Sequence, residues 1–174
     1  PERCRQGGVL SERCAGLEIF TATADDAAAV HGLVNELAEA TGLAGKFTSK
    51  VEDFLAHGFG ESPMFETLVA SLDGEVVAAA LYFYTFSTWR GEPGVYLQDL
   101  VVTESARGQG VGERLMRRLA AVAMRRGATH LRLAVDRNNH GAVKFYERCG
   151  LSVTEADDIY ETVDERFARM GHEQ

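Results

Sequence analysis

A glycine-rich segment is the part of this sequence best suited to chemistry. Gly108, Gly110 and Gly112 follow Arg107 and stand between an expected strand and an expected helix. Such a turn presents free backbone N–H groups and the positive end of a helix dipole, which together bind an anion such as a pyrophosphate. Glycine suits it because side chains would hold phosphates away from the backbone. The pattern favours a phosphate-binding loop over a plain tight turn, and the loop comprises Arg107, Gly108, Gln109, Gly110, Val111 and Gly112.

The spacing excludes two other nucleotide sites. A dinucleotide fingerprint, G-x-G-x-x-G, would need a third glycine where this sequence has Glu113. A Walker loop would need Ser or Thr after Gly45-Lys46, where Phe47 stands. No histidine has metal-ligand spacing with Cys, Asp or Glu, so no metal site is predicted.

The hydrophobic periodicity predicts the elements that position this loop. Asp73-Gly74 predicts a tight hairpin turn. Thr23 with Asp26, and Ser49 with Glu52, resemble capping boxes at helix starts. Strands are expected at 17–21, 65–72, 75–86, 95–103, 129–135 and 159–163, and helices before Gly42, before Gly58, from Val111 to Gly127, from Asn138 or Asn139 to Gly150, and at 164–170. This order predicts an α/β layer fold with a mixed, mostly antiparallel sheet flanked by helices.

Length and composition limit the class of protein. The 174 residues fit one domain, expected at 17–174 after a poorly ordered leader at 1–16. The net charge of −8 argues against a nucleic-acid partner, and no apolar stretch is long enough for a membrane span. Three cysteines form no C-x-x-C pair, and no secretory signal precedes the domain, so a cytoplasmic location is expected.

Two motifs carry a family resemblance. Residues 107–112 resemble the R-x-x-G-x-G acetyl-CoA signature of GNAT acetyltransferases, and Asn139-x-x-Ala142-x-x-Phe145-Tyr146 resembles their second cofactor-side motif. Within that superfamily, residues 51–61, 83–89 and 97–102 resemble the diamine (spermidine/spermine) and thialysine N-acetyltransferases. The resemblance covers about 17–170 and implies a GNAT fold, acetyl-CoA as co-substrate, a small-molecule primary amine as acceptor, and a homodimer.

The resemblance also implies roles on the cofactor side. The strand ending near Thr103 should separate from its neighbour and offer the amides of Leu100 and Val102 to acetyl-CoA, with Val101 between them. Tyr146 matches the family position of the general acid that protonates the departing thiolate. Ala142 and Asn139 would lie beside the cofactor, although the Asn139 side chain could equally cap its helix.

The acceptor side is less determined. An alkyl ammonium has a pKa of about 10.4, so only about one molecule in 2,500 is a free amine at pH 7 and a base must take its proton. Candidate bases are Asp99, Glu92, Glu61 and His57, although Asp99 could instead be a structural carboxylate. Polyamine-acting relatives carry acids where this sequence has Ser87 and Gln98, which puts polyamine specificity in doubt. The residues expected to contact the acceptor are Trp89, Gln98, Ser87 and Glu61. The alternative is a GNAT-fold acyl-CoA sensor with little turnover.

Overall fold

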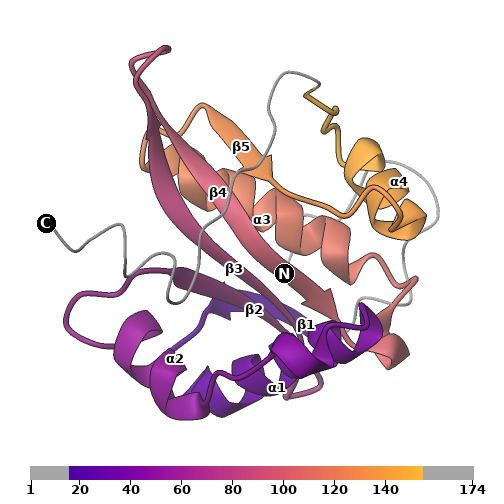
Figure 1. The fold of residues 1–174 in the computed structure, drawn as a ribbon. Coiled ribbons are helices and arrows are strands. Elements are labelled where there is room, and N and C mark those ends of the chain that lie inside the picture. Colours follow the sequence, from indigo (N-terminus) through magenta and orange to yellow (C-terminus); the bar gives the residue numbers. More distant parts are fainter. Residues whose placement is uncertain (1–15, 155–174) are drawn as a thin grey trace, which may run out of the picture. The chain divides into compact units, whose positions relative to one another are not determined.

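The computed structural model describes residues 16–154, which form two compact units, 16–136 and 137–154. The first unit holds a five-stranded sheet in the order β1-β2-β3-β4-β5 (Figure 1). Its strands are β1 (Leu17–Thr21), β2 (Glu66–Leu72), β3 (Glu75–Ser87), β4 (Glu92–Val102) and β5 (His130–Leu133). Its α-helices are α1 (Ala27–Ala40), α2 (Val51–Gly58) and α3 (Val111–Arg125), and the second unit contains α4 (His140–Arg148). The predicted leader and the elements predicted at 159–163 and 164–170 lie outside the described residues.

The sheet is mixed, as predicted. β1 to β4 are antiparallel neighbours, and β5 is parallel to β4. Asp73 and Gly74 both have positive φ, 52° and 86°, which is the backbone twist that a two-residue hairpin needs. The parallel pair is joined through α3, the crossover that the order of predicted elements required.

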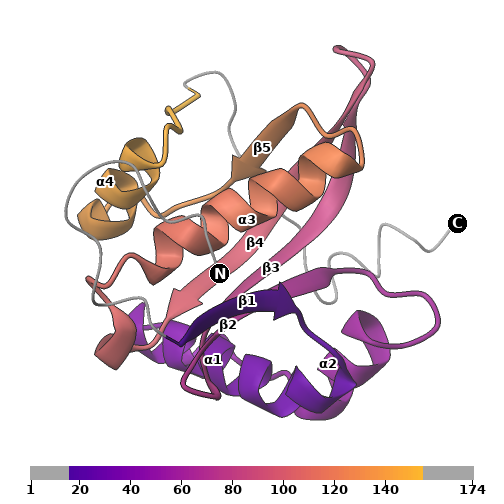
Figure 2. The same cartoon turned by 180° about the vertical axis from the view of Figure 1, so that it is seen from behind.

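Helices cover both faces of the sheet. Figures 1 and 2 show α1 and α2 against one face and α3 against the other. On the first face Val30 of α1 and Phe54 of α2 share a buried cluster with Leu81 and Val101 from the strands. On the second face Leu115 and Leu119 of α3 are fully buried. The two helical layers therefore hold the strands rigidly from both sides.

A polar cluster fastens the C-terminal end of α3 to the sheet. The Tyr82 hydroxyl donates a hydrogen bond of 3.0 Å to Glu66 on β2, and the Arg126 guanidinium forms an ion pair with the same carboxylate. Arg126 also lies 4.8 Å from the centre of the Tyr84 ring. These contacts fix the position of α3, and with it the turn that precedes the helix.

Some predicted boundaries were wrong by a few residues. α2 begins after Lys50, not Ser49, and the Asp53 carboxylate accepts the Lys50 N–H at 2.8 Å. β4 begins at Glu92, earlier than expected, because its first residues pair with the end of β3. β5 is shorter than expected at both ends. None of these shifts moves the glycine-rich turn.

Candidate active site

β4 and β5 separate part-way along their length. Within the described residues their pairing runs from Gly94↔His130 to Leu97↔Leu133, whereas β4 continues to Val102. Beyond Leu97, β3 is the only strand within residues 16–154 that pairs with β4. In this part of the chain one edge of β4 therefore has no strand partner, at the end nearest the glycine-rich turn.

Two backbone N–H groups point to that open edge. The Thr103 N–H donates to the Val77 carbonyl at 2.9 Å, so Thr103 faces β3. N–H groups alternate in direction along a strand, so Val101 also faces β3, while Leu100 and Val102 face the opposite side. The Val102 carbonyl confirms this direction, because it accepts a hydrogen bond of 3.0 Å from Nε of Arg107. The amides of Leu100 and Val102 therefore lie on the open edge, and their contact with acetyl-CoA stays a prediction, while Val101 contributes a buried side chain.

The glycine-rich turn has the geometry of an anion site. Gly108 and Gly110 have φ of 73° and 78°, values that side chains rarely adopt, and a Cβ at either position would meet open space. Gly110 is followed directly by α3, whose first N–H groups have no acceptor inside the helix. Gln109 Nε2 donates to the Ser105 carbonyl at 2.8 Å, and buried Val111 anchors the helix start. The turn thus combines open space with unpaired donors and a helix dipole.

A β-bulge puts two polar side chains on the same face of β4. Leu81 pairs with Asp99 and Tyr82 pairs with Leu97, so Gln98 is the extra residue. A bulge interrupts the alternation of side chains, so Gln98 and Asp99 both lie on the face covered by α1 and α2. Regular pairing would have placed them on opposite faces.

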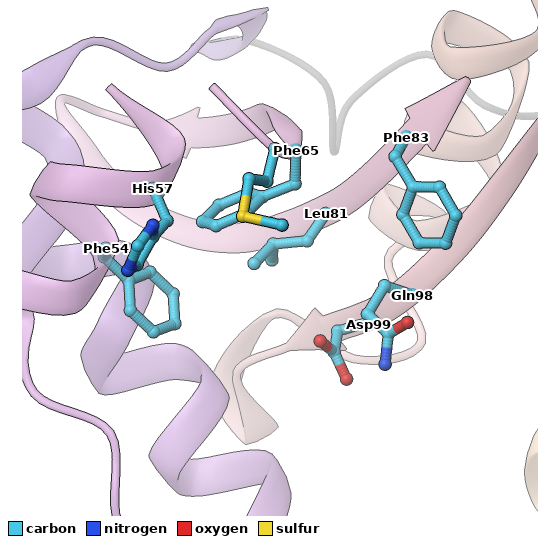
Figure 3. Close-up of a pocket in the computed structure, with 8 residues that line it drawn as sticks. Phe54, His57, Phe65, Leu81, Phe83, Gln98 and Asp99 are labelled. Atoms are coloured by element: carbon cyan, nitrogen blue, oxygen red, sulfur yellow. The ribbon is translucent and has the colours of Figure 1, made fainter. Parts of the chain in front are cut away.

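Gln98 and Asp99 line a pocket of about 430 Å³ between α2 and the sheet (Figure 3). This is a usual size for a small-molecule site. Figure 3 shows Phe54, His57 and Phe65 on one side, Gln98 and Asp99 next to each other on the other side, and Leu81 between them. The lining residues are Phe54, His57, Met64, Phe65, Leu81, Phe83, Gln98 and Asp99.

The titration of Asp99 is perturbed by its position in this pocket. Burial raises the pKa of its carboxyl above the ordinary value, because desolvation disfavours the charged form. A carboxyl in this state is poised to accept a proton or pair with a cation. Of the candidate bases, Asp99 and His57 line the pocket, whereas Glu92 and Glu61 do not.

Other residues predicted for the acceptor side lie elsewhere. Ser87, Trp89 and Glu92 belong to the end of the β3–β4 hairpin, where Trp89 is fully exposed. The Glu92 carboxylate accepts a hydrogen bond of 2.7 Å from the Thr129 hydroxyl, and Ser87 Oγ accepts one from the Arg90 N–H. Glu61 is exposed in the loop after α2. The residues lining the pocket include none of these four.

The second unit carries the remaining predicted residues. The Asn139 side chain accepts the Ala142 N–H at 3.0 Å, so Asn139 is the N-cap of α4. Tyr146 is half-buried on α4, with its ring centre 5.3 Å from that of Phe145. The cap uses the side-chain oxygen of Asn139 and not its amide nitrogen. A hydrogen bond from that nitrogen to pantetheine therefore stays a prediction. The role of Tyr146 as general acid also stays a prediction.

Sequence reasoning missed the aromatic walls of the pocket. Phe65 and Phe83 are strand or strand-edge residues that read as ordinary core. Gly58 is needed here for space rather than for φ: a Cβ would lie 2.6 Å from the Phe65 ring. The one available signal was the alternation that puts Leu81 and Phe83 on a common face of β3.

A comparison with known proteins identifies the family of this chain. A family model described as "Acetyltransferase (GNAT) family" matches residues 30–151. The chain belongs to the GNAT acetyltransferase family. Its activity is therefore that of an acyltransferase.

Relatives of this GNAT acetyltransferase agree with the sequence resemblance. It is 39% identical over 134 residues to thialysine N-epsilon-acetyltransferase of Bos taurus, covering 72% of this chain and 78% of the relative. It is 27% identical to spermidine/spermine N(1)-acetyltransferase-like protein 1 of Homo sapiens, covering 76% of this chain and 20% of that protein. An integron cassette protein from the mobile metagenome of V. cholerae has a TM-score of 0.78 at 25% identity, covering 91% of this chain and 99% of that one.

In residues 16–154, no group of three or more His, Cys, Asp or Glu side chains is placed to hold a metal ion. The helices of the same residues include none that is long and apolar enough to span a membrane.

Proposed function

We propose that this GNAT acetyltransferase moves an acetyl group from acetyl-CoA to a primary amine of a small molecule, a diamine or a lysine-like amine. The observation that carries the proposal is the arrangement around β4. One edge of β4 presents the amides of Leu100 and Val102 beside the glycine-rich turn. The bulge at Gln98 places the Asp99 carboxylate in the pocket, on the face of the sheet that α1 and α2 cover.

The chain's own groups fit acetyl-CoA. Open space at the Cβ positions of Gly108 and Gly110 leaves room for phosphates close to the backbone. The N–H groups at the start of α3 would hold the pyrophosphate, and Arg107 is held against β4 by its bond to the Val102 carbonyl. Acetyl-CoA would supply an acetyl thioester, which is the electrophile of the reaction.

The reaction can then be written with named groups. Asp99 accepts the proton of the bound ammonium, directly or through water, and the free amine attacks the thioester carbonyl. The N–H groups of Leu100 and Val102 stabilise the resulting oxyanion, each well-placed donor contributing about 3 kcal/mol. The nitrogen gives up its second proton to water, the carbon–sulfur bond breaks as the amide forms, and Tyr146 gives its phenolic proton to the thiolate. Tyr146 recovers a proton from solvent.

A thiol-release assay with purified protein tests the proposal. Acetyl-CoA is offered with a panel of lysine-like amines, diamines and polyamines, and at least one should be acetylated faster than acetyl-CoA is hydrolysed. Mass spectrometry should find the acetyl group on the primary amine. If no amine raises thiol release above hydrolysis while acetyl-CoA still binds, the protein is an acyl-CoA sensor instead.

A further inference from the structure

The walls of the acceptor pocket limit what can lie next to the reacting nitrogen. Five of the lining side chains are apolar, and three of these are phenylalanines: Phe54, Met64, Phe65, Leu81 and Phe83. Of the residues from 16 to 154, Asp99 is the only carboxylate that lines the pocket. His57 and Gln98 supply the other polar atoms, and Gln98 carries no charge.

One positive charge is therefore matched in this pocket and a second is not. An ammonium beside Asp99 pairs with the carboxylate, and the neighbouring aromatic faces also attract it. A second ammonium in the same cavity would have no partner of opposite charge, and beside the buried Phe54 and Leu81 its lost hydration would not be compensated. Moving an alkyl stem from water into the pocket carries no such penalty in free energy, because the walls are apolar.

We infer that the acceptor is an amine bearing a single positive charge within the pocket, on an apolar stem, and that Gln98 discriminates against short diamines. The inference rests on the proposed function and narrows its substrate class. The bulge is what makes Gln98 decisive, because it places an uncharged side chain beside Asp99 on the pocket face. The far end of a lysine-like amine is zwitterionic, so such an amine meets the condition when that end lies outside the apolar walls.

A matched pair of amines tests this. Pentylamine and 1,4-diaminobutane have the same number of non-hydrogen atoms and differ in one terminal group, methyl or ammonium. The four-carbon spacer is short for a cavity of about 430 Å³, so both nitrogens of the diamine lie among the rings. We expect kcat/KM for pentylamine to exceed that for 1,4-diaminobutane at least tenfold at pH 7.5, even though the diamine has two reactive ends.

The substitution Gln98→Glu should reduce that ratio at least tenfold by giving the second ammonium a partner. Gln98→Met removes the amide without adding charge and should keep the preference for pentylamine. Ala29→Glu adds the same charge on the exposed first turn of α1 and should leave the ratio unchanged. These controls separate a local charge from a general electrostatic effect.

The outcomes are distinguishable. A diamine acetylated as efficiently as pentylamine by the unmodified protein would overturn the inference and leave the proposed function standing. A ratio that Ala29→Glu shifts as much as Gln98→Glu would also overturn it. Failure of every amine in the wider panel would overturn the proposed function and this inference together.

Discussion

Among single residues, Asp99 is one at which the proposed activity and the stability of the fold favour different protonation states. Burial raises the pKa of its carboxyl, because the charged form is less stable inside the folded protein than in water. The proposed reaction needs that charged form to accept a proton. A carboxyl with a purely structural role would instead be stabilised by hydrogen bonds that lower its pKa.

The first prediction concerns the activity of Asp99→Asn. In the unmodified protein kcat/KM should rise as Asp99 loses its proton, with a midpoint above the usual range of a carboxylic acid. Asp99→Asn should lower kcat/KM by about two decades or more and remove this limb of the pH profile. Glu52→Gln, which neutralises an exposed carboxylate on α2, is the matched control and should preserve both.

The second prediction concerns the stability of the same variant. Because the folded-state pKa of Asp99 is raised, the folded protein binds more protons than the unfolded chain between the two pKa values, and stability is lost as pH rises through that window. Above it, the loss persists. Asp99→Asn should therefore raise Tm at pH 7, with the gain shrinking toward pH 4, about the unfolded value. A lower Tm for the variant at pH 7 would indicate a structural carboxylate.

The third prediction concerns Tyr146. Tyr146→Phe should lower kcat by one to three decades, because the thiolate loses its proton donor, and calorimetry should find acetyl-CoA affinity unchanged. Tyr84→Phe is the control: its buried hydroxyl has no hydrogen-bond partner in the described residues, and its loss should not slow turnover. Equal rates for Tyr146→Phe and the unmodified protein would remove Tyr146 from the mechanism.

Among the elements, local signals in the sequence predicted most of the scaffold. The bounds of β1 were predicted correctly, and Asp73-Gly74 identified the β2–β3 turn, because each depends on residues close together in the chain. The start before α1 was also local: the Asp26 carboxylate accepts the Thr23 N–H, which is one half of a capping box. The glycine-rich turn was predicted for the same reason, since its positive φ values select glycine.

The bulge at Gln98 could not be predicted in this way. Its existence depends on how β3 and β4 align, and the alternation from Leu97 to Val102 is equally consistent with regular pairing. The pocket could not be predicted either, because its walls come from three separate elements, α2, β3 and β4. Register is a tertiary property that short-range periodicity does not determine.

The fourth prediction compares two glycines. Gly110→Ala puts a side chain at φ of 78° before α3 and should destabilise the protein by about 1–2 kcal/mol while weakening acetyl-CoA binding. Gly32→Ala lies inside α1 with open space at its Cβ and should stabilise the protein by about 0.5–1 kcal/mol, with acetyl-CoA affinity unchanged. Chemical denaturation and calorimetry measure both quantities. Equal effects at the two positions would contradict the loop's role.

For the whole molecule, the resemblance to diamine and thialysine N-acetyltransferases predicts a homodimer. Sedimentation at micromolar concentration should give a mass of twice 19.0 kDa. The β3–β4 hairpin is one surface to examine, because Phe86 is 63% exposed and Trp89 fully exposed at its end. A single species at the chain mass would refute the dimer.

The early parting of β5 from β4 has a consequence for how this protein can evolve. Continuing β5 alongside β4 would complete ladder hydrogen bonds, each contributing about 1 kcal/mol, and would give a more heat-resistant sheet. Under the proposed mechanism, the same change would occupy the Leu100 and Val102 amides and stop turnover. We therefore expect selection for thermal tolerance to act on cores and surface loops, while this edge stays unpaired.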